Sequence, residues 1–380
     1  VPKVRPMKLS ARPVLLGVLP AALLLCLSSP APADGPKYVF LFIGDGMASA
    51  QIHAAEAYLA SSGKSSADAG QERRPRTRLT MRKLGTVGLC TTHAANRFVT
   101  DSAAAGTALA CGRKTDSGVV SMGQDRKTVF RTIAEAAHDA GRAVGIVSSV
   151  SIDHATPACF YAHSPSRGRY HDICVQLAES PFEFFGGGGM KGQVEGDSDA
   201  RDRAEQNGFV FAADSDALKE IDANRRVLTW NSSLGRGASM HYELDRLWMR
   251  RNGRTEAERK QMSLRDFTRQ AIRVLEDDPD GFFLMVEGGK IDWACHANDA
   301  AASIHDTVAF DNAVAEAYEF YLEHSDETLI VVTADHETGG MTIGFAGTRY
   351  SSFMDKVQYQ KVSYDQFNAT VAAWREAGDV

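Results

Sequence analysis

Short apolar runs, each followed directly by a glycine-rich or acidic turn, recur along the chain. Residues 37–43 (KYVFLFI) lead into Gly44-Asp45-Gly46, and similar runs occupy residues 143–147, 281–286 and 328–332. Continuous apolar runs of this length are typical of strands that are buried on both faces of a parallel sheet. The pattern therefore predicts four buried strands.

Segments with helical spacing of their apolar residues alternate with these runs. One covers residues 128–140 and stops at Gly141, with the apolar positions Val129, Ile133, Ala136 and Ala137. A longer one covers residues 298 to about 323, with Ile304, Val308, Ala315 and Tyr318 on one face. Strands alternating with helices predict an α/β fold, in which a mostly parallel central sheet is sandwiched between helices.

Residues 186–264 depart from this alternation. They hold four consecutive glycines at 186–189, a charged stretch around 195–205 and an arginine-rich segment at 246–254. We expect a surface insertion here, such as a lid or crown, and not a separate domain. Residues 34–380 are thus predicted to form a single domain.

The first 33 residues have the pattern of an export signal. Lys8 and Arg12 precede an apolar run at 14–27, and Ala31-Pro32-Ala33 provides small residues for cleavage. A membrane anchor fits less well, because the run is shorter than the ~20 residues of a spanning helix and Pro20 interrupts it. A lipoprotein signal at Cys26 fits poorly because leucine precedes the cysteine. We therefore expect a cleaved signal peptide over residues 1–33 and a periplasmic or extracellular protein.

The charge of the chain narrows the classes of partner that it can bind, and its cysteine content limits the number of disulfides. Residues 34–380 hold 38 basic and 48 acidic residues, a net charge of −10, which indicates neither nucleic acid nor an anionic membrane as a partner. The acidic residues can instead bind cations. Five cysteines remain after the signal, so at most two disulfides can form, and the sequence leaves their pairing open.

Potential metal ligands follow the predicted strands. Asp292 and His296 are four residues apart, which is one helical turn, so both can face one ion. Three further ligand positions follow strands: Asp45, Glu287, and Asp335 with His336. Each alone fits an ordinary surface carboxylate or histidine. Together, oxygen ligands mixed with imidazoles predict sites for Zn²⁺ and Mg²⁺.

Ser102, in the stretch VTDSAAAGTALACG, has two readings. It can cap a helix that runs to about residue 109, or it can be a nucleophile at the helix terminus, where N–H groups favour an anion. A serine nucleophile needs a metal to lower its hydroxyl pKa. The predicted metal ligands favour the nucleophile, and Ala103, Ala104 and Ala105 would leave room for a phosphoryl group.

Five stretches resemble the alkaline phosphatases, in the order in which that family has them. They are residues 43–47 (IGDGM), 100–108 (TDSAAAGTA), 154–158 (HATPA), 287–292 (EGGKID) and 333–340 (TADHETGG). The match spans residues 38 to about 345. It implies hydrolysis of small phosphate monoesters, a phosphoserine intermediate, two zinc ions and one magnesium ion. It also allows a homodimer.

The resemblance also implies a role for each site residue. Ser102 would be the nucleophile, and Arg167 would clamp the phosphate, although a run with Arg169 is also compatible with solvated surface. His154 would lie near the magnesium, and Trp293 follows a zinc aspartate. The implied ligands are Asp45, Asp335 and His336 for the first zinc; Asp292 and His296 for the second; and Asp45, Thr156 and Glu287 for magnesium.

The carboxyl end departs from the family pattern. The family has a third protein ligand to the second zinc, a histidine near the chain end, and here no histidine follows His336. Residues 364–376 predict a helix with Phe367, Val371 and Trp374 on one face. We expect a reading frame truncated before the final family segment, with an exposed sheet edge or core face, a weak second zinc site and slow turnover. A natural short form that is a metal- or phosphate-binding relic is the alternative, and a related phosphodiesterase is another. A sulfatase is disfavoured because its modification motif is absent.

Overall fold

The computed structural model of the protein describes residues 35–62, 78–222 and 225–378. The predicted signal peptide, residues 1–33, lies outside the described residues. Residues 36–380 belong to one compact unit. Among the described helices, none has both the length and the apolarity needed to cross a membrane.

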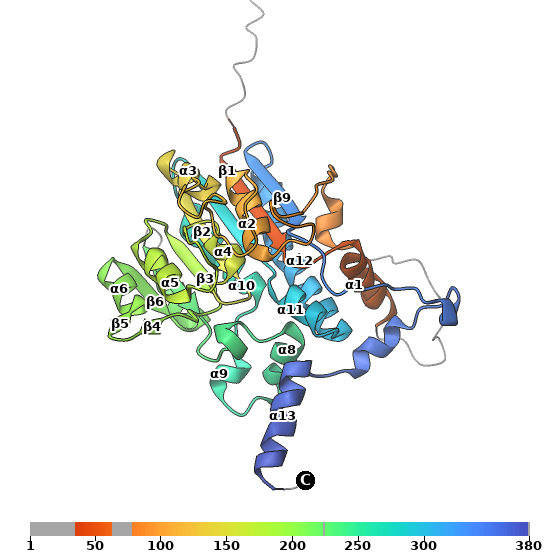
Figure 1. The fold of residues 1–380 in the computed structure, drawn as a ribbon. Helices are drawn as coiled ribbons and strands as arrows, with labels where there is room; N and C mark the ends of the chain where they lie inside the picture. The colour runs from red at the N-terminus through yellow and green to blue at the C-terminus, as the bar shows by residue number, and fades with distance from the viewer. Residues whose placement is uncertain (1–34, 63–77, 223–224, 379–380) are drawn as a thin grey trace, which may run out of the picture. The chain divides into compact units, whose positions relative to one another are not determined.

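A seven-stranded sheet, in which all neighbouring strands are parallel, forms the centre of this unit (Figure 1). Its strand order is β6-β7-β3-β2-β8-β1-β9. The bounds are β1 (Tyr38–Gly44), β2 (Ala143–Ser148), β3 (Phe184–Gly187), β6 (Phe209–Ala212), β7 (Arg226–Trp230), β8 (Phe282–Glu287) and β9 (Thr328–Ala334). A separate antiparallel ribbon joins β4 (Val194–Glu195) to β5 (Ser198–Asp199). The predicted fold class is confirmed.

Helices cover both faces of the sheet. The helices are α1 (Ser49–Ser61), α2 (Ser102–Cys111), α3 (Ile133–Asp139), α4 (Ala155–Ala158), α5 (Tyr170–Glu179), α6 (Ala200–Gln206), α7 (Ser215–Lys219), α8 (Glu243–Asn252), α9 (Glu256–Arg259), α10 (Leu264–Leu275), α11 (Lys290–His296), α12 (Ala300–Glu323) and α13 (Tyr364–Glu376). Short 3₁₀ turns occupy Thr80–Lys83, Arg236–Ala238, Ala346–Thr348 and Met354–Tyr359.

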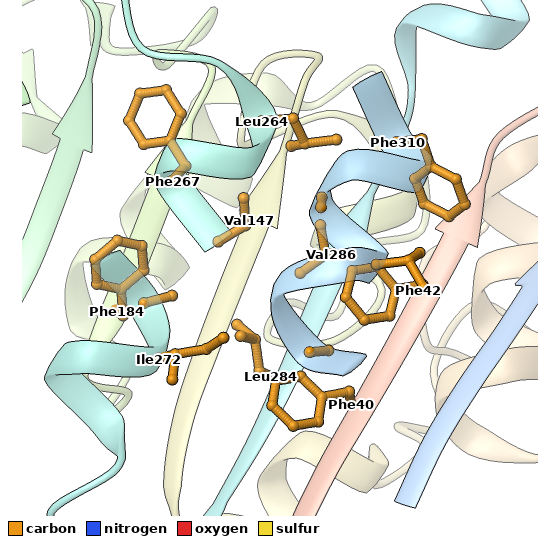
Figure 2. Packing of buried hydrophobic residues seen from close by; sticks show 14 of the residues in the cluster. Phe40, Phe42, Val147, Phe184, Leu264, Phe267, Ile272, Leu284, Val286 and Phe310 are labelled. Atoms are coloured by element: carbon orange, nitrogen blue, oxygen red, sulfur yellow. The ribbon is translucent and has the colours of Figure 1, made fainter. Parts of the chain in front are cut away.

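Alternate residues of β1 enter two different hydrophobic cores. Phe40 and Phe42 pack in the core that α1, α10 and α12 cover, where Phe42 lies 5.9 Å from Phe310 between ring centroids. Ile43 packs in the opposite core, which α2, α3, α4 and α5 cover. Figure 2 shows the first core, with Phe40, Phe42, Leu284 and Val286 from neighbouring strands beneath the helices. The sheet is therefore buried on both sides, as the continuous apolar runs predict.

The interpretation of residues 186–264 as a surface insertion needs correction. The segment contributes β6 and β7 to the central sheet, and Val227 and Leu228 of β7 are fully buried. These strands have only four and five residues, and the charged stretches that flank them obscure their apolar signal in the sequence. The β4–β5 ribbon, α6, α7 and the part after β7, which includes α8 and α9, lie outside the central sheet.

Two helix predictions also change. Helix α3 begins at Ile133 and not near 128, because Thr132 caps it: its hydroxyl accepts a bond from Glu135 N–H, and the Glu135 carboxylate accepts one from Thr132 N–H. Helix α12 begins at Ala300, after Asp299 caps it. It is buried around most of its circumference, and of the predicted face only Ile304 is fully buried, with Val308, Ala315 and Tyr318 partly exposed.

The predicted exposed sheet edge and carboxyl-terminal helix are both present. Strand β9 is the last in the sheet order, and its Leu329 and Val331 side chains are exposed. Helix α13 has the predicted bounds, and its Phe367 and Trp374 are exposed.

The five cysteines that the structure describes (Cys90, Cys111, Cys159, Cys174 and Cys295) are all free thiols.

Truncation of Phe42 should strongly destabilise the domain. Phe42 is fully buried in the strand that leads to Asp45, so Phe42→Ala should cost about 3–5 kcal/mol of unfolding free energy. Phe98→Ala removes the same atoms from an exposed ring and should change stability by less than about 0.5 kcal/mol. Urea unfolding of both variants measures the difference, and equal stabilities would contradict this packing.

Candidate active site

Parallel register brings the polar ends of three neighbouring strands together. Strand β1 pairs with β8 so that Ile43 lies opposite Glu287, and with β9 so that Gly44 lies opposite Ala334. Asp45 and Asp335 directly follow their strands, and Glu287 ends β8. All three carboxylates therefore lie at the carboxyl edge of the sheet, where α/β proteins bind ligands.

The first cluster consists of Asp45, Asp335 and His336, whose potential ligand atoms all lie within 4.8 Å of one another. His336 Nε2 is 3.5 Å from Asp45 Oδ1 and 3.2 Å from Asp335 Oδ2. A turn allows adjacent Asp335 and His336 to face the same point, because Asp335 Oδ1 accepts bonds from His336 N–H (2.8 Å) and Gly46 N–H (3.1 Å). Gly46 has φ +68°, and a Cβ there would lie 2.9 Å from Asp292.

The second cluster shares Asp45. Potential ligand atoms of Asp45, His154 and Glu287 lie within 4.8 Å of one another. Thr156, on α4, is fully buried, and its hydroxyl has no hydrogen-bond partner. Glu287 Oε2 accepts a bond from the Ser148 hydroxyl, which fixes the carboxylate at the end of β2 and β8.

Several buried polar atoms in both clusters have no hydrogen-bond partner. They are both carboxylate oxygens of Asp45, Oε1 of Glu287, Oδ2 of Asp335, Oγ1 of Thr156 and Nδ1 of His154. Burial and neighbouring carboxylates raise the pKa values of Asp45 and Asp335, and burial raises that of Glu287 to about 7. Unpaired buried acceptors are costly unless a cation binds them. The donor set therefore fits hard or borderline cations such as Mg²⁺ and Zn²⁺.

The remaining predicted ligand pair lies on α11. His296 Nε2 is 3.5 Å from Asp292 Oδ1, as the spacing of one turn predicts. Asp292 is buried and accepts a 2.6 Å bond from the Thr338 hydroxyl, whereas the His296 side chain is 72% exposed. Within the described ranges, this pair forms no group of three with a further Asp, Glu, His or Cys ligand.

Ser102 is the first residue of α2, but it does not cap the helix. Asp101 does so by accepting a bond from Ala104 N–H (3.1 Å), which leaves the Ser102 hydroxyl free of that role. Ser102 Oγ lies 3.4 Å from His336 Nε2, so the serine meets the first cluster. The helix terminus and the candidate metal ligands thus converge on one hydroxyl.

The small residues of α2 allow close packing. Ala103 and Ala104 are buried, and Ala103 belongs to the hydrophobic core. A Cβ on Gly106 would lie 3.1 Å from Cys159 Sγ and 3.4 Å from Thr156 Cα. Small side chains therefore allow α2 to lie close to α4, and this contact sets Ser102 relative to Thr156.

Arg167 lies against the candidate site and is only partly exposed. Its Nη1 donates to Asp101 Oδ2 (2.9 Å) and its Nη2 lies 3.3 Å from His154 Nε2. The Arg167 side chain is 28% exposed, against 58% for Arg169. Despite burial, the bonds from Arg167, Gly118 and Ala104 hold the pKa of Asp101 below its usual value.

His154 and Trp293 are neighbours, with ring centroids 5.7 Å apart in an edge-to-face arrangement. Burial, followed by the charge of Arg167, lowers the pKa of His154 to about 3, so its imidazole is neutral near pH 7.

Sequence reasoning missed Asp101, Ser148 and Thr338 as partners of the site. Asp101 and Thr338 lie inside two of the five motifs, which was the available signal.

The fold and the site define an α/β protein whose candidate metal-ligand cluster lies at the carboxyl edge of a parallel sheet, beside a serine at a helix terminus. Comparison with known sequences assigns the family. The alkaline phosphatase family model matches residues 36–182 and 187–377. The chain belongs to the alkaline phosphatase family.

Individual relatives agree with this assignment. Alkaline phosphatase 4 of Bacillus subtilis is 33% identical over 321 residues, which is 82% of this chain and 64% of the relative. The human tissue-nonspecific isozyme is 32% identical over 347 residues, which is 79% of this chain and 63% of the relative. The chain thus spans less than two thirds of the length of these relatives.

Solved structures have the same fold. The alkaline phosphatase of Thermus thermophilus has a TM-score of 0.74 and 27% identity, covering 91% of this chain and 71% of that chain. The cold-active enzyme of Shewanella sp. has a TM-score of 0.72 and 28% identity, covering 86% and 74%. A variant of the TAB5 enzyme, with a TM-score of 0.64 and 30% identity over 82% and 80%, has magnesium bound in its M3 site.

Removal of metal ions should make the stability depend on pH through Glu287. Burial raises its pKa to about 7 from the usual 4.5, so between these values the folded state keeps a proton that the unfolded state has released. The free energy of unfolding of the chelator-treated protein should therefore fall as pH rises across this window, by on the order of 3 kcal/mol at most.

Urea unfolding at pH 5 and pH 8 in the presence of a chelator measures this effect. Glu287→Gln cannot titrate and should show a smaller pH dependence than the wild type. Glu195→Gln alters an exposed carboxylate and should match the wild type. An unchanged pH dependence in Glu287→Gln would show that this carboxyl is not desolvated in the metal-free protein.

Proposed function

We propose that this protein hydrolyses phosphate monoesters through a phosphoserine at Ser102. The observation that carries the proposal is the position of the Ser102 hydroxyl, at the amino terminus of α2 and 3.4 Å from His336 in a buried cluster of unpaired carboxylates. Membership of the alkaline phosphatase family supports the same chemistry.

The proposal includes two zinc ions and one magnesium ion. Asp45, Asp335 and His336 would hold the first zinc, Asp292 and His296 would contribute to the second, and magnesium would take Asp45, Thr156 and Glu287. When bound, these cations would offset the buried negative charge and act as Lewis acids toward the phosphate and the serine hydroxyl.

Ser102 performs the covalent step. Its hydroxyl gives up its proton as Oγ attacks phosphorus, the new O–P bond forms while the bond from phosphorus to the ester oxygen breaks, and the leaving alcohol takes up a proton. Water then attacks the phosphoserine, which releases inorganic phosphate and restores the hydroxyl. Backbone N–H groups at the start of α2 favour the negative charge that develops on the phosphoryl oxygens.

Arg167 orients the phosphoryl group. Asp101 holds one side of its guanidinium, so the remaining N–H donors keep a fixed direction and can bind two phosphoryl oxygens. Neutral His154 lies against the other side without adding repulsion. A serine nucleophile paired with an arginine clamp favours monoesters over diesters, because the clamp needs two oxygens that carry no second ester group.

The proposed setting follows from the sequence. We infer that the chain is exported after removal of residues 1–33 and acts in the periplasm or outside the cell on small soluble esters. A homodimer is compatible with the family. The alternative of a metal- or phosphate-binding relic rests on the incomplete second zinc site. Catalytic turnover by the chain would contradict that alternative.

Ser102→Ala should abolish turnover. The variant lacks the oxygen that forms the phosphoserine, so hydrolysis of p-nitrophenyl phosphate should fall by at least ~10³-fold, and acid quenching should trap no labelled phosphoserine. Ser325→Ala, at an exposed position, is the matched control and should keep wild-type activity. Full activity in Ser102→Ala would refute the proposed mechanism.

Arg167→Lys should weaken catalysis although it preserves the charge. Lysine cannot bind two phosphoryl oxygens in the fork geometry, so kcat/KM should fall by about 10- to 100-fold. Arg169→Lys makes the same change at an exposed neighbour that pairs with Asp172 and should stay within about twofold of wild type. Equal effects in both variants would show that Arg167 acts as a surface residue and not as a phosphate clamp.

A further inference from the structure

A pocket of about 590 Å³ lies directly beside the candidate site. His154, Trp293 and His296 line it, together with Tyr170, Lys191 and Arg236. No carboxylate is among the lining residues that the structure describes. The wall is therefore basic and aromatic in a chain that is acidic outside its first 33 residues.

Lys191 provides the clearest charge on this wall. Its ammonium lies 3.9 Å from the centroid of the Tyr170 ring, and no ion pair is found for it within the described ranges. Asp153 fixes the backbone beneath it: Oδ1 accepts from Lys191 N–H (3.1 Å) and Oδ2 from Gly192 N–H (2.7 Å). A Cβ on Gly192 would lie 2.4 Å from the Tyr170 carbonyl carbon, so the close approach of the two segments requires glycine.

Arg236 provides a second cation that is partly neutralised. Its Nη2 donates to the Tyr364 hydroxyl (2.9 Å), and its Nε lies 3.4 Å from Asp365 Oδ1. The guanidinium carbon is 5.9 Å from the centroid of the Trp293 ring. Because Asp365 offsets part of this charge, Lys191 contributes most of the free positive charge of the pocket.

The pocket adjoins both halves of the proposed phosphate site. His154, on its wall, lies 3.3 Å from Arg167, the proposed phosphate clamp. His296, also on its wall, lies 3.5 Å from Asp292 of the second proposed zinc site. A phosphoryl group held between Arg167 and Ser102 would therefore place the rest of its ester in or next to this pocket.

We propose that this pocket binds the leaving group and selects esters whose alcohol or phenol carries a second anionic group. Lys191 would bind a carboxylate or a second phosphate, while Tyr170 and Trp293 would contact the carbon skeleton. The volume suits a small organic molecule and not a polymer. This inference rests on the proposed phosphatase function.

Three aryl esters of similar shape test the charge preference: phenyl phosphate, 4-carboxyphenyl phosphate and 1,4-phenylene bisphosphate. In Lys191→Met, which keeps the apolar stem, kcat/KM for the two anionic esters should fall about 5- to 10-fold more than for phenyl phosphate. Lys191→Arg should restore most of the preference. The carboxylate and phosphate arms show which anion the pocket prefers.

Lys219→Met is the matched control, since Lys219 lies on α7, outside the pocket, and pairs with Asp216. It should keep the wild-type ratio between esters. If Lys191→Met still hydrolyses phenyl phosphate and its ratio of kcat/KM between anionic and neutral esters is unchanged, the proposed role of the pocket is overturned while the phosphatase function stands. If the wild type hydrolyses none of the esters, the proposed function fails. Calorimetry with 4-hydroxybenzoate then tests separately whether the pocket binds an anionic leaving group. Binding to the wild type that is weaker in Lys191→Met would support the pocket proposal, and absence of binding would overturn it.

Discussion

Asp45, Glu287 and Asp335 are almost completely buried against one another because the parallel register of β1, β8 and β9 ends all three strands at one level. Like charges in a desolvated site repel, and burial raises the pKa of each carboxyl. The sheet cannot relieve this strain locally, since the same strands are packed in hydrophobic cores on both faces. A bound cation is the ordinary way to stabilise such an arrangement, so fold and metal affinity are linked.

Ser102, the proposed nucleophile, is placed beside this cluster by contacts that are themselves structural. Asp101 caps α2 and binds Arg167, so one carboxylate fixes both the serine helix and the proposed phosphate clamp. Small residues in α2 bring it close to α4, which carries Thr156 of the second cluster. Thr338 bonds to Asp292 and lies 3.2 Å from His336, and so couples the two proposed zinc sites. Changes in these partners should therefore alter catalysis by moving groups that never touch the substrate.

The pocket has a different origin from the carboxylate cluster. Strand ends supply the carboxylates Asp45, Glu287 and Asp335, whereas the pocket wall comes from loops and helices, including Lys191, Arg236 and Tyr364. Asp153 connects the two, because it precedes His154 and fixes the backbone of Lys191. Loops of this kind can vary while the sheet stays fixed, which lets one reaction centre accept different leaving groups.

Sequence alone determined the strands of the central sheet that are continuously apolar, the ligand positions that follow them, and Asp292 with His296 one turn apart, because these are local patterns with a fixed period. Tertiary structure alone decided that β6 and β7 join the sheet, since their short apolar runs are stabilised only by pairing with distant strands. The tertiary structure also placed Arg167 against the site while Arg169 stayed exposed. It showed that Asp101 and not Ser102 caps α2, and it brought Lys191 to the edge of the site. Apart from the cap, in which Asp101 accepts from Ala104 N–H three residues further on, each of these depends on contacts between residues far apart in the chain, which no local pattern records.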